Sequence, residues 1–242
     1  MTDFIDISLT SIPPRFSRLG ETLESLLSQT VEIKNIWLNI PKSYKRFPNW
    51  DGVLPKVPKG ITIKRINEDL GPASKLIPTL KNTFSEDYIL YCDDDWDYKP
   101  TWAESFVFHS CKKTSAIAAS TFSVERLGKK NGVIIQGFGG VLVRKKFFTK
   151  TDLRIEKQFS WVDDIWFSAC LCKNKIKILK NEEASKLYCA SIVDDHALQN
   201  TLFDSVRRAD LNKAAASHVT KTFGIWISVS YTHLTLPTNR EV

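Results

Sequence analysis

Four aspartates within five positions are the residues of this chain best suited to chemistry. They follow the apolar run YILYC at 88–92 and are Asp93, Asp94, Asp95 and Asp97. Consecutive carboxylates repel one another unless a counter-ion is present. If the extended backbone continues beyond the apolar run, Asp93 and Asp95 project to one side and Asp94 to the other. Carboxylate oxygens are the preferred ligands of Mg²⁺ and Mn²⁺, so we predict that Asp93 and Asp95 hold one of these ions.

A turn or a helix cap is the alternative interpretation of the same acids. Aspartate is common in turns and ahead of helices, and a helix is predicted to begin at Pro100. A turn rarely needs three consecutive acids, however, because their mutual repulsion is costly without a counter-ion. The pattern therefore favours the metal site.

The elements that must position these acids alternate along the chain. Apolar or alternating runs predict strands at 4–10, 33–40, 61–66, 88–92, 115–121 and 133–144. Helical spacing and helix-start residues predict helices after Ser17, after Gly71-Pro72, from Pro100 to about Lys112, over 162–173, and as one or two polar helices over 198–222. Four prolines and two glycines predict an irregular connection over 41–60.

This alternation predicts a single domain of the α/β class, with a mostly parallel central sheet and helices on both faces. In such sheets ligands collect at the carboxyl ends of the strands. The aspartates that follow the run at 88–92 therefore lie where chemistry is expected.

Composition limits the partners. The 242 residues are 43% hydrophobic and carry a formal net charge of +7, which favours anionic partners such as phosphates, acidic glycans or a membrane surface. The basic residues are spread along the chain, so no nucleic acid is predicted. Five cysteines without a C-x-x-C pair predict reduced thiols. We recognise no leader and no membrane-length apolar segment, and we predict a cytoplasmic protein that is compatible with peripheral contact at the inner membrane face.

Five motifs in order carry a family resemblance. They are ISLTSIPPR, LGPASKL, the D-x-D triplet after YILYC, GFGGVLVRK and WVDDIW. Over about residues 4–200 the chain resembles a glycosyltransferase of the GT-A fold, close to the family 2-like nucleotide-sugar transferases. The resemblance implies a Rossmann-like nucleotide-sugar part at about 1–98, a D-x-D site for Mn²⁺ or Mg²⁺, and an acceptor part at about 99–228.

The resemblance also implies residues that bind the donor. Thr10, Ser11 and Arg15 follow the first strand, where the family seats the nucleotide, although Arg15 could equally cap a turn. Lys75 follows Ser74, a potential N-cap, and would reach a phosphate near the positive end of a helix; an ordinary solvated lysine is the alternative.

Two further predictions concern the donor site. Asp94 belongs to the acidic triplet and is assigned to the donor-binding residues. Gly139 and Gly140 would let the backbone approach the donor sugar, unless they form a bulge in a strand.

The acid pair Asp163 and Asp164 would supply the catalytic base. Both fall at a predicted helix start, where the dipole favours the ionised form, and one of them could take the proton of an attacking hydroxyl. The resemblance favours Asp163, and the alternative is that both acids only stabilise the helix. Trp161 and Trp166 flank the pair and would suit a sugar ring, although core packing is the commoner use of tryptophan. His196 is the candidate third metal ligand, with a bystander role as its alternative.

The function that the resemblance implies is transfer of a sugar, of hexosyl type, from a nucleotide diphosphate sugar to a glycan or lipid-linked acceptor, as in polysaccharide biosynthesis. We predict inversion by direct displacement because that course needs one base, and retention stays open. A metal-dependent phosphohydrolase and a non-catalytic glycan-binding module are the alternatives. Residues 229–242 read as a non-native, adaptor-derived tail after a domain at 1–228.

Overall fold

The computed structural model describes most of the chain. The described residues are 5–84, 86–109, 114–156, 159–194, 196, 202–203 and 206–227. The predicted adaptor-derived tail at 229–242 and Cys111 lie outside them. Of the four cysteines that are described, all have free thiols, with Cys92 and Cys170 buried and Cys189 exposed.

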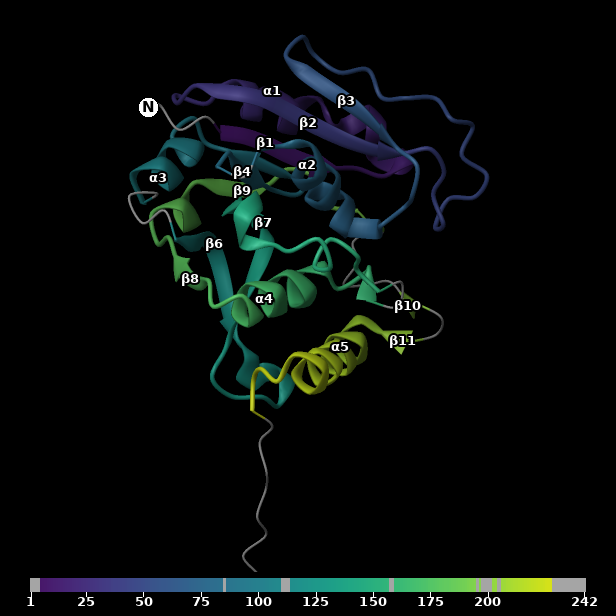
Figure 1. The fold of residues 1–242 in the computed structure, drawn as a ribbon. Helices are drawn as coiled ribbons and strands as arrows, with labels where there is room; N and C mark the ends of the chain where they lie inside the picture. The colour runs from purple at the N-terminus through teal and green to yellow at the C-terminus, as the bar shows by residue number, and fades with distance from the viewer. Residues whose placement is uncertain are drawn as a thin grey trace, which may run out of the picture.

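A seven-stranded sheet forms the centre of the molecule (Figure 1). Its strands, in spatial order, are β3 (Ile61–Ile66), β2 (Ile33–Pro41), β1 (Ile5–Thr10), β4 (Tyr88–Tyr91), β7 (Val133–Arg144), β6 (Ser115–Ser123) and β8 (Lys177–Lys180). The pairs β3–β2, β2–β1, β1–β4 and β6–β8 are parallel, whereas β7 runs antiparallel to both β4 and β6. The predicted mostly parallel α/β sheet is confirmed.

Helices cover both faces of this sheet. The α-helices are α1 (Gly20–Leu27), α2 (Ile77–Asn82), α3 (Trp102–His109), α4 (Asp163–Lys173) and α5 (Arg208–Phe223). The 3₁₀ helices are η1 (Pro13–Arg18), η2 (Gly71–Lys75), η3 (Val124–Leu127), η4 (Lys145–Phe147) and η6 (Ala184–Lys186). Figure 1 shows α5 lying beside α4, and their apolar side chains share one core cluster.

Successive side chains of β4 point to opposite faces of the sheet. Tyr88 and Leu90 pack in the apolar cluster that holds α1 and α3, whereas Ile89 and Tyr91 pack in the cluster that holds α2, α4 and α5. All four side chains are buried, so β4 reads as a continuous apolar run, as expected for a strand covered on both faces. β4 is the fourth of the seven strands and is covered on both faces, so the acidic segment that follows it begins at the centre of the sheet.

Two short sheets complete the fold. The strand β5 (Trp96–Tyr98) pairs antiparallel with β9 (Tyr188–Ala190), and β10 (Leu202–Phe203) pairs antiparallel with β11 (Val206–Arg207). The β5–β9 pairing holds the chain after Tyr188 beside the acidic segment that precedes Trp96. Ser191 and Ile192 donate backbone hydrogen bonds to the Asp95 carbonyl, at 3.0 and 3.2 Å.

The predicted elements differ from the observed ones mainly in the last quarter of the chain. Of the helix or helices predicted over 198–222, α5 is found from Arg208 onward, whereas 202–203 and 206–207 form β10 and β11. Residues 198–201 and 204–205 lie outside the described residues. No helix in the described part of the chain combines the length and the apolar character needed to cross a membrane.

Candidate functional site

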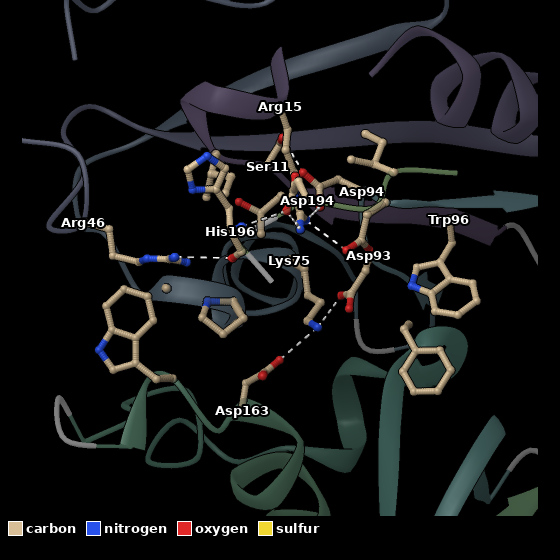
Figure 2. A pocket seen from close by; sticks show the side chains of 18 of the residues that line it. Ser11, Arg15, Arg46, Lys75, Asp93, Asp94, Trp96, Asp163, Asp194 and His196 are labelled. Carbon is tan, nitrogen blue, oxygen red and sulfur yellow. Dashed lines mark hydrogen bonds and ion pairs between the residues drawn. The ribbon is translucent and has the colours of Figure 1, made fainter. Parts of the chain in front are cut away.

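A cavity of about 570 Å³ opens where β1 and β4 end (Figure 2). Among the described residues that line it, seven are acidic and four are basic. The acids are Asp69, Asp93, Asp94, Asp95, Asp163, Asp164 and Asp194. The basic residues are Arg15, Arg46, Lys75 and Arg208. The predicted residues Thr10, Ser11 and His196 also line the cavity, so ten of the twelve predicted site residues meet there.

Arg15 organises one acidic cluster. It lies in η1, which begins at the Pro13-Pro14 pair directly after β1, and it is 7% exposed. Its Nη1 lies 2.7 Å from Asp94 Oδ1 and 3.0 Å from Asp95 Oδ2, and its Nε lies 2.8 Å from Asp194 Oδ2. Burial alone would lower the pKa of Arg15, but the hydrogen bond to Asp194 and the charges of Asp94 and Asp95 outweigh it and raise that pKa.

Asp94 is the most enclosed acid of the triplet. It is 5% exposed and accepts a hydrogen bond from Ser11 as well as from Arg15. Burial raises the pKa of Asp94 although Arg15 and Ser11 oppose the shift. Thr10 donates to the Asn39 carbonyl at 2.7 Å, which ties the end of β1 to β2. Ser11 and Arg15 therefore connect the end of β1 to the acidic segment after β4.

Lys75 organises a second cluster. Its Nζ lies 2.5 Å from Asp93 Oδ1 and 3.2 Å from Asp163 Oδ2, as Figure 2 shows. The side chain is 4% exposed. Burial alone would lower the pKa of Lys75, but Asp163, Asp93 and Asp164 outweigh it and raise that pKa well above its ordinary value. The lysine ends η2 and lies two residues before α2 begins at Ile77, so it is near a helix start as predicted, but the N-cap is Leu76 instead of Ser74. Its partners are carboxylates.

The predicted alternation of the triplet is wrong. We expected Asp93 and Asp95 on one side and Asp94 on the other, but Asp94 and Asp95 share Arg15 while Asp93 turns to Lys75. The reason is that β4 ends at Tyr91 and the chain bends at Asp94 and Asp95 before β5 begins.

The donor set fits a divalent cation in part. Asp95 Oδ1 is buried and has no hydrogen-bond partner among the described residues. Burial, with the charges of Asp93 and Asp94 added, raises the pKa of Asp95 to about 7. A cation beside this oxygen would supply the missing partner and would also stabilise the ionised form of Asp95.

The predicted third ligand is not brought into that set. Within the described residues, no group of three histidine, cysteine, aspartate or glutamate side chains is arranged to hold a metal. The His196 ring packs against Phe47, with centroids 5.9 Å apart, and Arg46 donates to the His196 carbonyl at 3.3 Å. His196 therefore belongs to the cavity wall, and the predicted metal ligands that are left are Asp93 and Asp95.

The two acids at the start of α4 have different surroundings. Asp163 is 1% exposed and is paired with Lys75. Asp164 accepts a hydrogen bond at Oδ1 from the Gly137 backbone at 3.1 Å. Burial first, and then the neighbouring Asp163 charge, raise the pKa of Asp164 to about 7. A carboxyl with such a pKa can exchange a proton near neutral pH.

The glycines of the GFGG run do not act as predicted. Neither Gly139 nor Gly140 is among the residues that line the cavity. A Cβ at Gly139 would lie 2.8 Å from the Tyr188 ring, and one at Gly140 would lie 2.4 Å from the Trp102 ring. Gly140 also has a φ of +99°, which a side chain disfavours. Both glycines let β7 pack on aromatic rings, and within the GFGG run it is Gly137 whose backbone N–H contacts a cavity residue, Asp164.

We expect Gly137→Ala to lower kcat/KM by about tenfold or more, because a shift of about 1 Å in a positioning residue can cost up to a hundredfold. The new Cβ would lie 2.7 Å from Lys75 Nζ and 3.4 Å from Asp164 Oδ1. It would therefore displace the ammonium group from its carboxylates. Steady-state kinetics with a melting curve tests this, and Gly20→Ala is the control since nothing lies within 4 Å of a Cβ there. Equal activity of the two variants would contradict the role of Gly137.

The sequence interpretation missed several cavity residues. Asp194 and Arg46 carry charge into the cavity, and Arg208 enters it from the start of α5. Asp194 had a signal, since it stands two positions before His196 in VDDHAL. Trp161 lines the cavity, whereas Trp166 is 5% exposed and donates to the Asp152 carbonyl at 2.9 Å, which makes it a core residue.

Comparisons with known proteins bear on the fold. The sequence matches no family model and no curated protein sequence. Among solved structures, residues 1–349 of S. aureus TarS align with a TM-score of 0.52 and 12% identity, over 91% of this chain and 72% of that one. The same TarS fragment in complex with UDP gives 0.49 and 11%, over 91% and 69%. TarS itself gives 0.47 and 12%, over 79% of this chain and 37% of that one. The first alignment shows a shared fold.

Proposed function

We propose that this chain is a glycosyltransferase that takes its sugar from a nucleotide diphosphate sugar. The observation that carries the proposal is the cavity with its two buried basic residues: Arg15 is paired with the acidic segment and Asp194, and Lys75 lies between Asp93 and Asp163 of α4. TarS, whose fragment shares the fold, is a GT-A-type glycosyltransferase, which supports this choice over other uses of the fold.

The position of the cavity suits a nucleotide. In the sheet, β2 and β3 lie on one side of β1 and β4 lies on the other, so the strand order reverses between β1 and β4. Open α/β sheets bind ligands at the carboxyl ends of strands where such a reversal occurs. Arg15 follows β1 and the acidic segment follows β4, so both stand at this point. We assign Arg15 and Lys75 to the diphosphate, where each would exchange a carboxylate partner for a phosphate oxygen.

A divalent cation is part of the proposal. Asp93 and Asp95 would hold it, since Asp95 offers an unpartnered buried oxygen and Asp93 is partly exposed to the cavity. When bound, Mn²⁺ or Mg²⁺ would neutralise charge on the diphosphate leaving group.

One acid of the pair at the start of α4 accepts the proton of the acceptor hydroxyl. An acceptor hydroxyl attacks the anomeric carbon, a new carbon–oxygen bond forms, and the bond to the diphosphate breaks with the electron pair leaving on the nucleotide diphosphate. The hydroxyl proton passes to a carboxylate, and we assign this role to Asp164 because Asp163 is committed to Lys75. One base on one face of the sugar is what a direct, inverting displacement needs.

We propose a family 2-like enzyme of hexosyltransferase type, with a glycan or lipid-linked acceptor as in polysaccharide biosynthesis. A cytoplasmic location with peripheral contact at the inner membrane face accords with the net charge of +7, which would attract an anionic surface.

Release of nucleotide diphosphate from a panel of sugar nucleotides tests the function, with Mn²⁺, with Mg²⁺ and with a chelator. We expect release from one class of donor, and a loss of about a hundredfold or more on metal removal because the ion stabilises the leaving group by several kcal/mol. Hydrolysis of simple phosphate esters without any transfer would instead identify a phosphohydrolase. Sugar binding that is unaffected by chelator, without any release, would identify a glycan-binding module.

A further inference from the structure

Arg208 is a cavity residue that the proposed chemistry does not use. It lines the cavity, yet its Nη1 is buried and has no hydrogen-bond partner among the described residues. By contrast, Arg15 and Lys75 each hold two or more carboxylates. A buried donor that stays unpaired destabilises the protein, and more so when the group is charged. Such a group is expected to have a partner when the protein works.

The position of Arg208 on its helix makes this cost larger. Arg208 is the first residue of α5, a helix of 16 residues. The N-terminus of a helix carries partial positive charge, so a cation is unfavourable there and an anion is favourable. Asp210 in the same turn is exposed. No side chain caps the helix start with a hydrogen bond. An oxyanion would satisfy both the guanidinium group and the first backbone N–H groups of α5.

The location of Arg208 points to the acceptor. Arg208 lines the same cavity as Asp164, the acid assigned as base. Both α4, which carries Asp164, and α5 begin at this cavity and pack together. The diphosphate is assigned to Arg15 and Lys75, which belong to other elements.

We propose that Arg208 and the start of α5 bind an oxyanion, a phosphate or a carboxylate, that is carried by the sugar acceptor. This inference rests on the proposed glycosyltransferase function and narrows its acceptor to an anionic molecule. The oxyanion holds the acceptor while its hydroxyl faces Asp164. The guanidinium group contributes two N–H donors in a planar fork, a geometry that matches both kinds of oxyanion.

A binding measurement tests the subsite without any turnover. Methyl phosphate, acetate and methyl glucoside are titrated by NMR into the full chain, with the donor site filled by the nucleotide diphosphate that the donor panel identifies. The variants are Arg208→Ala, Arg208→Lys and Arg207→Ala, the last because Arg207 is exposed, adjacent and not among the cavity residues. We expect Arg208→Ala to weaken methyl phosphate or acetate binding by about tenfold, because a charge-assisted hydrogen bond contributes about 1.5–3 kcal/mol. Arg207→Ala should change it less than about twofold, as is usual for an exposed charge.

The three probes distinguish the sources of the oxyanion. Preference for methyl phosphate indicates a phosphorylated acceptor, and preference for acetate indicates a uronic acid or another carboxylate. Methyl glucoside should be insensitive to Arg208→Ala. Equal effects of Arg208→Ala and Arg207→Ala would overturn the proposal, as would binding of the anions that no Arg208 variant changes. If the panel shows no donor, the same titrations are run on the free chain, so the subsite is judged separately from the proposed function.

A kinetic measurement tests the link to the acceptor once a donor is known. Phosphorylated, carboxylated and neutral forms of one acceptor sugar are compared. We expect kcat/KM for the preferred anionic form to fall by about tenfold or more in Arg208→Ala and to recover in part in Arg208→Lys, which keeps the charge and loses the fork. An equal loss with the neutral sugar would show a structural role and would overturn the assignment.

Discussion

Replacing Asp164 with Asn is expected to lower kcat by about 10²–10⁴-fold, the range that general-base catalysis contributes, while nucleotide binding is retained. Asn keeps the size of the side chain and keeps an oxygen that can accept from the Gly137 backbone, so α4 should still begin correctly. What is lost is the capacity to take a proton. Single-turnover kinetics together with calorimetry of nucleotide diphosphate binding separates the two effects.

The pH dependence of kcat/KM is a second test of Asp164 as the base. Burial and Asp163 raise the pKa of Asp164 to about 7, so the carboxyl is protonated below that pH and cannot act as base. Wild-type kcat/KM should therefore rise as the pH increases through about 7, and in Asp164→Asn this acid limb should disappear. Bound cation and donor would shift the limb in kcat relative to that in kcat/KM.

Two variants control this experiment. Glu24→Gln changes an exposed acid of α1 that does not line the cavity and should leave kcat unchanged. Asp163→Asn removes a partner of Lys75 and should reduce stability more than Asp164→Asn does. If Asp163→Asn abolished turnover while Asp164→Asn kept most of it, the assignment of the base would pass to Asp163.

Lys75→Met should be the most destabilising single change in the site. The methionine fills similar space but removes the cation that lies between Asp93 and Asp163. Removing one partner of a buried ion pair typically costs about 3–5 kcal/mol, because the remaining charge stays buried and unpaired. For a chain of this size the melting temperature should fall on the order of 10 °C. Nucleotide binding should weaken as well, and calorimetry measures that loss.

The loss of stability in Lys75→Met should depend on pH. Lys75 lowers the pKa of Asp164, although burial and Asp163 keep that pKa near 7, so the variant raises it further. When the pKa of a carboxyl is higher in the folded state than in the unfolded state, ionisation disfavours the folded state. The loss of stability grows as the pH rises towards the folded-state pKa, and it disappears when the carboxyl is protonated in both states. The difference from wild type should thus be larger at pH 8 than at pH 5.5. Lys81→Met, an exposed lysine of α2, is the control and should melt as wild type does. A similar fall in both variants would refute the role assigned to Lys75.

Periodicity was sufficient to predict most of the central sheet. The strands predicted at 61–66 and 133–144 coincide with β3 and β7, and those at 33–40 and 88–92 differ from β2 and β4 by one residue. These strands are either buried on both faces or have apolar and polar residues in clear alternation, so burial alone determines the order of apolar and polar residues along them. The antiparallel direction of β7 could not be predicted this way, because direction depends on how distant segments meet.

The contents of the cavity were predictable, but the contacts within it were not. Arg15 and Lys75 were predicted to meet the donor, and both do reach the cavity, yet the acids that hold them come from segments as distant as Asp194. The bend at Asp94 and Asp95 turns one carboxylate away from its neighbours, and no local pattern encodes that bend. The prediction for Gly139 and Gly140 has a related explanation. The Tyr188 and Trp102 rings leave no room for a Cβ at these positions, and sequence alone does not distinguish a glycine beside a ring from a glycine beside a ligand.

The central position of β4 restricts how the chain can be divided. Between β1 and β7, Tyr88–Tyr91 is paired along both edges, parallel on one side and antiparallel on the other. A fragment cut after Tyr98 would leave one edge of this apolar strand without its partner, and an unpaired apolar edge is a template for aggregation. Recombinant work on the segment up to Tyr98 alone would therefore begin with an insoluble product, whereas boundaries placed beyond α5 keep β4 paired along both edges.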